Sequence, residues 1–268
     1  MGKDAGMSEI KAIFVTGGAS GIGRATAQRF ARAGWRVGIA DVDEAGMAET
    51  AALLHGAPAT RHRLDVRDRD GWAAALEAFT AASGGRLHVL FNNAGVPFGG
   101  PLADASWEGI DRTIAINLGG VLNGAKIAHP YLKRTPGSCL LNTASASAIY
   151  GSAGLATYSA TKFAVRALTE ALDGEWHRDG IRVRAIVPGF IDTPLLHGTP
   201  EGSNRSIRET VTGAGLELTS AEAVADAAWD AVHGERLLVP VGKTARRMTF
   251  AARWLPGSLR KTMRRSRM

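Results

Sequence analysis

The sequence predicts a single α/β domain in which a doubly wound parallel sheet of about seven strands carries helices on both faces. Short apolar or β-branched runs alternate with longer Ala-rich stretches of helical length, which is typical of consecutive β–α units. Glycine is abundant, at 33 of 268 residues, as expected where many tight turns join strands to helices. No internal repeat or low-complexity linker marks a second domain.

Each element is expected where the spacing of apolar residues changes. The expected strands lie at 12–16, 36–40, 60–65, 87–92, 138–143, 181–187 and 236–240. The expected helices cover 21–33, 44–55, 69–83, 106–117 with a continuation to about 133, 155–178 and 219–232.

Residues 190–218 depart from this alternation. The segment is rich in Gly, Thr, Ser and Pro, and its periodicity is weak. A long irregular insertion in a compact domain is usually functional, so we expect a lid over a site. The alternative is a disordered surface loop.

The domain is expected to cover residues 10–242. Residues 1–9 lack the apolar middle of a signal peptide and are expected to form a disordered leader. No run of 18 apolar residues occurs, which argues against a membrane-spanning helix. The single cysteine, Cys139, cannot form an intramolecular disulfide. We therefore expect a cytoplasmic protein, with peripheral membrane contact left open.

The net charge of +7 comes from residues 243–268. That segment has nine basic and no acidic residues, and subtracting these nine charges leaves the first 242 residues at −2. Its apolar spacing predicts an amphipathic helix interrupted at Pro256–Gly257. Three interpretations of this basic tail stay open: packing on a neighbouring subunit or over the substrate cleft, contact with an anionic membrane surface, and binding of an acidic ligand such as a CoA thioester or nucleic acid. Nucleic acid is disfavoured because the body of the protein is nearly neutral.

The stretch TGGASGIG (16–23) follows the first strand and opens the first helix. Its glycines let the backbone turn tightly and approach a pyrophosphate at the helix N-terminus, where free N–H groups point outward. Such a turn is weak evidence alone, but its place between a strand and a helix strengthens it. The residues assigned to this dinucleotide turn are Gly17, Ser20, Gly21, Ile22 and Gly23.

Asp41 ends the second strand and indicates which dinucleotide binds. Its carboxylate can accept hydrogen bonds from both adenosine ribose hydroxyls and would repel a 2′-phosphate. A helix-capping role is the alternative, although Asp43 can fill it. Arg24 leaves some room for NADP. The expected cofactor is NAD.

Tyr158 and Lys162 stand four residues apart in TYSATKFA, so a helix places them one turn apart on one face. A phenol with a pKa near ~10 is a poor base at neutral pH. A neighbouring cation favours the phenolate and lowers that pKa toward the working range. The alternative is an ordinary exposed helix pair.

Seven motifs stand together in the chain: TGGASGIG, LDV (64–66), NNAG (92–95), Asn117 in IAINLGG, Ser145 in NTASAS, YSATK (158–162) and PGFIDT (188–193). In order and spacing they resemble the short-chain dehydrogenase/reductase family, over roughly residues 10–240. The resemblance implies a Rossmann-like fold, for which we expect the strand order 3-2-1-4-5-6-7. It also implies an NAD(P)-dependent oxidoreductase that acts on an alcohol/carbonyl pair.

The same resemblance assigns roles to individual residues. The family's catalytic tetrad maps onto Asn117, Ser145, Tyr158 and Lys162. Ser145 would bind the substrate oxygen, Lys162 would also hold the nicotinamide ribose, and Asn117 would hold a water next to Lys162. The implied cofactor contacts are Asp65 and Val66 at the adenine, Asn92, Ala94 and Gly95 along the cleft, and Pro188, Gly189, Ile191 and Thr193 at the nicotinamide end. Asn93 is expected to tie its strand to a neighbour, and no metal site is expected.

The preferred hypothesis is an NAD-dependent dehydrogenase/reductase of a lipophilic secondary alcohol or ketone. Its expected substrate walls are Val96–Phe98, 146–150, Leu155, Phe190 and the lid 194–215. One alternative is an NADPH-dependent reductase of 3-oxoacyl thioesters. Another is a non-catalytic NAD sensor recruited to membranes. The resemblance also implies a homotetramer or dimer, with helices 106–133 and 155–178 as the expected interface.

Overall fold

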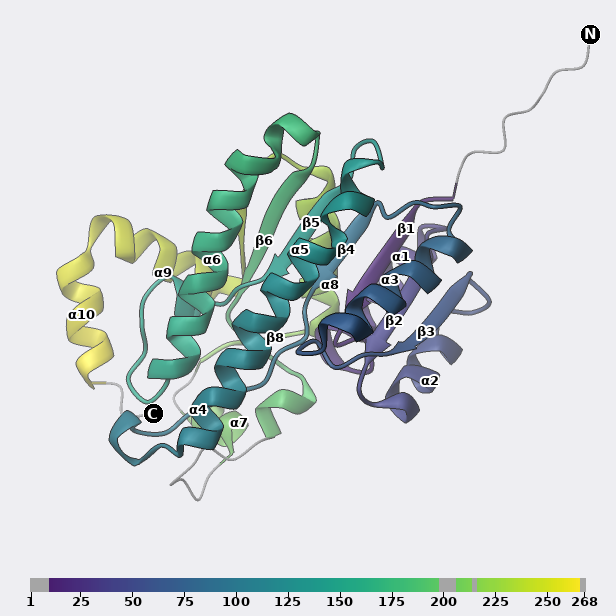
Figure 1. Cartoon of the computed structure of the whole chain (residues 1–268). Helices are drawn as coiled ribbons and strands as arrows, with labels where there is room; N and C mark the ends of the chain where they lie inside the picture. Colours follow the sequence, from purple (N-terminus) through teal and green to yellow (C-terminus); the bar gives the residue numbers. More distant parts are fainter. Residues whose placement is uncertain (1–9, 198–205, 214–215, 266–268) are drawn as a thin grey trace, which may run out of the picture.

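Seven parallel strands form one sheet in the order β3-β2-β1-β4-β5-β6-β9 (Figure 1). The computed structural model describes residues 10–197, 206–213 and 216–265. The strands of this sheet are β1 (Ala12–Thr16), β2 (Arg36–Asp41), β3 (Ala59–Arg63), β4 (Val89–Asn92), β5 (Cys139–Thr143), β6 (Arg182–Pro188) and β9 (Leu238–Val241). β9 is the seventh of them in chain order, so the predicted strand order is confirmed.

Helices cover both faces of the sheet. The α-helices of the described residues are α1 (Gly21–Arg32), α2 (Glu44–Ala52), α3 (Arg69–Ala82), α4 (Trp107–Ile114), α5 (Gly120–Lys133), α6 (Ala156–Trp176), α7 (Ile207–Gly213), α8 (Ala221–His233), α9 (Gly242–Trp254) and α10 (Pro256–Arg265). Helices α3, α5 and α6 lie together on one face (Figure 1), where Trp72 and Leu132 belong to the core. Helices α1, α2 and α8 supply the core of the other face, which contains Phe30 and Val224.

The central strands show why their sequences are almost continuously apolar. Successive side chains of a strand point to opposite faces, so Ile13 and Val15 join the core beneath α1 whereas Phe14 joins the core beneath α3. A parallel strand with helices on both faces has no solvent-facing side. All five residues of β1 are accordingly buried.

The structure differs from the predicted elements in two segments. The helix expected over 106–133 is interrupted between α4 and α5 by a π-helical turn, Ala115–Gly119. The segment 190–218 contains a parallel pair of two-residue strands, β7 (Phe190–Ile191) and β8 (Leu218–Thr219), and the helix α7. Elements this short carry too few residues to show a periodicity. Residues 198–205 and 214–215 of the expected lid lie outside the described residues, as does the leader 1–9.

The segment expected to form a basic tail contains two helices, α9 and α10, which meet at Leu255 (Figure 1). Helix α9 begins directly after β9 and packs on β9 and β6. Within the described ranges, no helix has both the length and the apolar character needed to cross a bilayer.

Candidate active site

A cavity of about 490 Å³ lies at the carboxyl edge of the sheet, where parallel α/β sheets bind their ligands. Most of its lining comes from the segments that follow β1 to β6 and from helices α4 and α6. Its lining residues lie far apart in the sequence, from Gly17 to Leu196. The predicted site residues in its lining are Gly17, Ser20, Gly21, Ile22, Asp41, Asp65, Val66, Ala94, Gly95, Ser145, Tyr158, Lys162, Pro188, Gly189, Ile191 and Thr193.

The glycine turn is built so that only a residue without a side chain fits. Gly17 has φ +65°, and a Cβ there would lie 3.0 Å from the Cα of Ala94. Gly21 has φ +50°, and its Cβ would lie 3.1 Å from Cγ2 of Thr193. A Cβ on Gly23 would collide with the carbonyl oxygen of Gly17, so Gly23 lets helix α1 start close beneath the turn rather than lining the cavity. This bare backbone at the start of α1 fits a dinucleotide pyrophosphate.

Asp41 lies at the end of β2 with its carboxylate fixed by the backbone. Its Oδ2 accepts a hydrogen bond from the Ala19 N–H and its Oδ1 accepts one from the Asp43 N–H, both at 3.1 Å. Asp43 caps α2 by accepting from the Gly46 N–H at 3.0 Å, so the cap is filled as the sequence predicts. Arg24 stays close to the glycine turn but does not line the cavity, because its guanidinium donates to the Ala19 carbonyl and pairs with Glu49 at 2.8 Å.

Asp65 has a partner that the sequence analysis missed. The Arg67 guanidinium binds its carboxylate, with Nη2–Oδ2 at 2.6 Å and Nε–Oδ1 at 3.0 Å. This hydrogen bond holds the pKa of Asp65 below its usual value. Both side chains line the cavity at the end of β3. The signal was present in the sequence, since Arg67 follows directly on the LDV motif.

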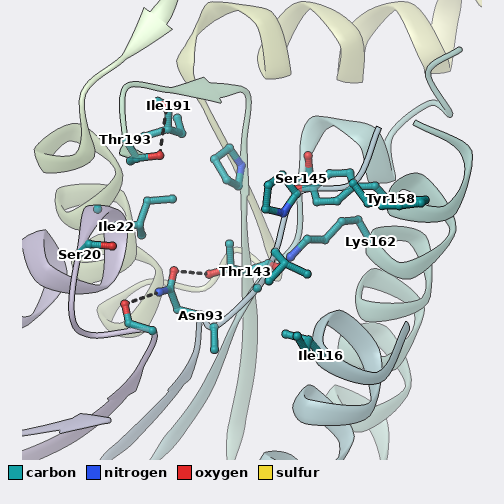
Figure 2. A pocket seen from close by; sticks show the side chains of 18 of the residues that line it. Ser20, Ile22, Asn93, Ile116, Thr143, Ser145, Tyr158, Lys162, Ile191 and Thr193 are labelled. Carbon is teal, nitrogen blue, oxygen red and sulfur yellow. Dashed lines mark hydrogen bonds between the residues drawn. The ribbon is translucent and has the colours of Figure 1, made fainter. Parts of the chain in front are cut away.

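The side chains of Asn92 and Asn93 have different surroundings. Asn92 is 3% exposed, and its Nδ2 donates to the Val121 carbonyl and to Oδ1 of Asn142. It therefore lies behind the cavity wall, contrary to the expectation that it lines the cleft, because alternation along β4 turns its side chain toward α5. Asn93 donates to the Thr16 carbonyl at 3.0 Å. It also accepts from the Thr143 hydroxyl at 3.2 Å (Figure 2). It ties β4 to its neighbours as predicted, and it also lines the cavity.

Ser145, Tyr158 and Lys162 lie together on one side of the cavity, with Ile191 and Thr193 on the other (Figure 2). Tyr158 and Lys162 belong to the first turns of α6, and Ser145 follows β5. The Lys162 ammonium lies 5.7 Å from the centre of the Tyr158 ring and donates to the Thr143 carbonyl at 2.9 Å. Lys162 is only 4% exposed, so the pair is not an ordinary surface pair.

Burial controls the ionisation of this pair. It raises the pKa of the Tyr158 phenol above its ordinary value, and a hydrogen bond with the Ser145 hydroxyl acts in the opposite direction. Burial also lowers the pKa of Lys162 to about 8. The sequence predicts that Lys162 lowers the pKa of Tyr158. The net direction in the structure is upward, because removing the phenol from water outweighs the stabilisation of its charged form.

Asn117 lies in the π-helical turn and is fully buried. Its Oδ1 accepts from the Val96 N–H at 2.8 Å and its Nδ2 donates to the Val96 carbonyl at 2.9 Å. A Cβ on Gly95 would lie 3.2 Å from Oδ1 of Asn117 and 3.8 Å from Nζ of Lys162. Asn117 therefore stands behind Gly95, close to Lys162, and holds the loop that forms the next part of the wall. Its expected role as a water ligand stays a prediction.

Much of the remaining cavity lining is apolar. It includes Val96, Pro97, Phe98, Leu155, Phe190, Pro194 and Leu196, together with Ile116 and Arg112, which were not predicted from the sequence. Of the expected wall 146–150, Ser147 lines the cavity. From the lid segment, Arg208 of α7 forms an ion pair with Asp192, which follows β7. Among the described residues, no cluster of His, Cys, Asp and Glu is arranged to hold a metal ion.

Comparisons with known proteins agree with this geometry. A family model for "short chain dehydrogenase" matches residues 11–204. The "Probable oxidoreductase EphD" of Mycobacterium tuberculosis is 34% identical over 266 residues, which cover 94% of this chain and 44% of that protein. This chain thus spans less than half the length of that relative. The "2,5-dichloro-2,5-cyclohexadiene-1,4-diol dehydrogenase LinX" of Sphingobium indicum is 38% identical over 192 residues, which cover 71% of this chain and 76% of LinX.

A solved structure has the same fold throughout. It is a short-chain dehydrogenase/reductase from Burkholderia phymatum in complex with NAD, with a TM-score of 0.81 at 27% identity over 95% of each chain. The family match covers well over half of the chain. The chain belongs to the short-chain dehydrogenase/reductase family of oxidoreductases.

Proposed function

We propose that the protein transfers a hydride between NAD(H) and a lipophilic secondary alcohol or its ketone, with Tyr158 as the group that moves the proton. One observation carries the proposal. Ser145, Tyr158 and buried Lys162 converge on the wall of a cavity whose other end is the glycine turn and Asp41. When bound, the nicotinamide would supply or accept the hydride next to this wall.

The raised pKa of Tyr158 suits the reduction of a ketone. Because burial raises that pKa, the phenol is protonated at neutral pH and can donate its proton to the oxygen of a ketone. The Ser145 hydroxyl can hydrogen-bond the same oxygen and stabilise the charge that develops there. In the oxidative direction the phenol must first lose its proton, and the Lys162 ammonium stabilises the resulting phenolate.

The preference for NAD rests on Asp41. Its carboxylate is held at the cavity by two backbone N–H groups, where it can bind ribose hydroxyls and repels a 2′-phosphate. Arg24, the cation nearest in sequence to the glycine turn, is engaged by Glu49. These contacts support NAD over NADP.

A second candidate function is the reduction of 3-oxoacyl thioesters with NADPH. The basic helices α9 and α10 favour it, because they could receive an acidic carrier. Asp41 disfavours it through its repulsion of the 2′-phosphate. A sensor that binds NAD without turnover is disfavoured by Tyr158 and Lys162 together. Lys162 alone could hold the nicotinamide ribose, but binding without turnover gives no use to a phenol placed beside a buried ammonium, which costs free energy to bury.

The test is turnover of a panel of lipophilic secondary alcohols and ketones with NAD(H) and NADP(H), comparing the wild type with Tyr158→Phe. We expect NAD-linked turnover and a loss of roughly 10²- to 10⁴-fold in kcat for the variant, which is the usual contribution of a proton-transfer group. Tyr150→Phe is the matched control, because Tyr150 lies outside the cavity lining. Clear NAD binding with no turnover of any panel member would contradict the proposal.

A further inference from the structure

Helix α9 has one face that packs on the protein and one that projects into solvent. Ala245 is fully buried and Met248 is half-buried, and these side chains face the sheet. The opposite face carries two aromatic side chains, Phe250 at 60% exposure and Trp254 at 62%. Leu255, at the corner between α9 and α10, is 52% exposed. Three large apolar side chains between residues 250 and 255 are therefore exposed to solvent.

Cations surround these apolar side chains. Helical spacing places Lys243, Arg246, Arg247 and Arg253 on the same face of α9 as Phe250 and Trp254, and all four are exposed. On α10, Leu259 is 6% exposed and faces inward, whereas Arg260, Lys261 and Arg264 are exposed. Within the described ranges no carboxylate forms an ion pair with any of these cations. We call this surface of α9 and α10 the basic-aromatic surface.

We propose that the basic-aromatic surface docks the protein on the face of an anionic phospholipid bilayer. Lys and Arg side chains near a negatively charged leaflet each contribute about 1 kcal/mol of attraction. Trp and Phe favour the boundary between headgroups and acyl chains, and long basic side chains can extend past them to the phosphates. The exposed cations and the exposed apolar side chains are thus both compatible with an anionic phospholipid surface.

Two other partners fit less well. A second copy docking through this surface would bring two sets of like charges together, which is unfavourable. A single-stranded nucleic acid could neutralise the cations and stack bases on Phe250 and Trp254. Leu255 would gain nothing from such stacking, whereas acyl chains accept all three side chains.

The docking helix is joined to the wall of the cavity. A Cβ on Gly189, a cavity-lining residue, would lie 3.5 Å from Cβ of Thr244 in the first turn of α9. The backbone N–H of Lys243 donates to Oε2 of Glu217, beside β8, at 2.8 Å. Docking through α9 would therefore hold the cavity at a fixed, short distance from the lipid. For catalysis this consequence rests on the proposed function, because a lipophilic alcohol or ketone would be concentrated there.

The experiment is flotation of the full chain with vesicles of phosphatidylcholine alone and of phosphatidylcholine with phosphatidylglycerol. We expect binding to the anionic vesicles that weakens with added salt, since screening reduces charge attraction. Arg246→Gln with Arg247→Gln should weaken that binding by roughly 30-fold, from about 1 kcal/mol for each charge. Phe250→Ser with Trp254→Ser should weaken it by roughly tenfold or more.

Two controls carry changes of the same kind away from the surface. Ile10→Ser with Leu53→Ser removes two exposed apolar side chains, and Arg32→Gln with Arg61→Gln removes two exposed cations; both should bind vesicles like the wild type. Retained thermal melting shows that each variant is folded. Equal binding by the surface variants and the wild type would overturn the proposal, as would tighter binding of a single-stranded oligonucleotide than of anionic vesicles. Vesicle binding can be measured without turnover. Binding without activity would therefore contradict only the proposed function, and activity without binding would contradict only this inference.

Discussion

At the scale of single residues, Lys162 is the most unusual side chain of the cavity, because an ammonium with 4% exposure loses most of its hydration. Its charge is stabilised in part by the hydrogen bond to the Thr143 carbonyl. The pKa falls from 10.5 to about 8. The unfolded chain therefore binds more protons than the folded chain between these two values, and the contribution of Lys162 to stability rises with pH across that window.

This linkage predicts a pH-dependent difference between the wild type and Lys162→Met. The free energy of unfolding of the wild type, minus that of the variant, should rise by up to about 3 kcal/mol as the pH rises from 8 to 10.5. Urea denaturation of both proteins across this range measures the difference, and subtraction removes the titration of groups that lie far from Lys162. A difference that stays flat would mean that Lys162 titrates normally.

Asp41 leads to a second prediction at this scale. Asp41→Asn removes the charge but keeps one oxygen that can accept from a backbone N–H. The ratio of kcat/KM for NAD to that for NADP should fall by roughly 10- to 100-fold, because a hydrogen bond to a charged group contributes about 1.5–3 kcal/mol. Asp43→Asn is the control, since Asn also caps helices. An unchanged ratio in Asp41→Asn would place cofactor choice elsewhere in the cavity.

At the scale of elements, the π-helical turn Ala115–Gly119 has the clearest link to the site. Such turns are rare and frequently occur at functional sites. This one directs Asn117 at the backbone of Val96, where both atoms of its amide group are used. The interruption between α4 and α5 therefore serves to anchor the loop after β4, which carries Gly95 and much of the apolar wall.

Asn117→Ala should accordingly affect stability as well as activity. Both backbone polar groups of Val96 lose their partner, so we expect a loss of about 2 kcal/mol or more in the free energy of unfolding together with a lower kcat/KM. Asn117→Asp keeps the acceptor for the Val96 N–H and should lose less stability. The measurements are chemical denaturation and steady-state kinetics. If activity falls while stability is unchanged, the water-holding role is favoured over the anchoring role.

At the scale of the whole molecule, helices α4, α5 and α6 present large apolar side chains to solvent. Trp107 is 79% exposed, Ile114 44%, Leu122 45% and Phe163 40%. Apolar exposure of this extent on adjacent helices is typical of an interaction surface. We propose that these helices join copies of the chain, in agreement with the interface expected from the sequence.

Light scattering after gel filtration tests this assembly. The wild type should have the mass of two or four chains, and Leu122→Asp with Phe163→Asp should shift it toward a single chain, because a buried unpaired carboxylate strongly disfavours an interface. Phe250→Asp should leave the mass unchanged, since α9 lies outside the proposed interface. Dissociation by Phe250→Asp instead would assign the basic-aromatic surface to a neighbouring subunit.

Much of this molecule follows from its sequence alone. The doubly wound sheet could be predicted because β–α alternation leaves few arrangements of a parallel sheet open, and its strand order followed from the resemblance to the short-chain dehydrogenase/reductase family. The glycine turn, Asp41 and the Tyr158–Lys162 pair could be predicted because their chemistry depends on spacings within one turn or one strand–helix junction. Such short-range relations depend only on which residues are close together in the sequence.

Only the tertiary structure decided the features that depend on distant neighbours. Asn92 and Asn93 are chemically alike, and the alternation of β4 between its two flanking strands determines which one reaches the cavity. The upward shift of the Tyr158 pKa follows from burial by surrounding segments, and helical spacing carries no information about burial depth. The two-residue strands β7 and β8 exist because Phe190 and Leu218 meet across an intervening segment. Hydration and long-range pairing are properties of the assembled chain, and therefore no local pattern could reveal them.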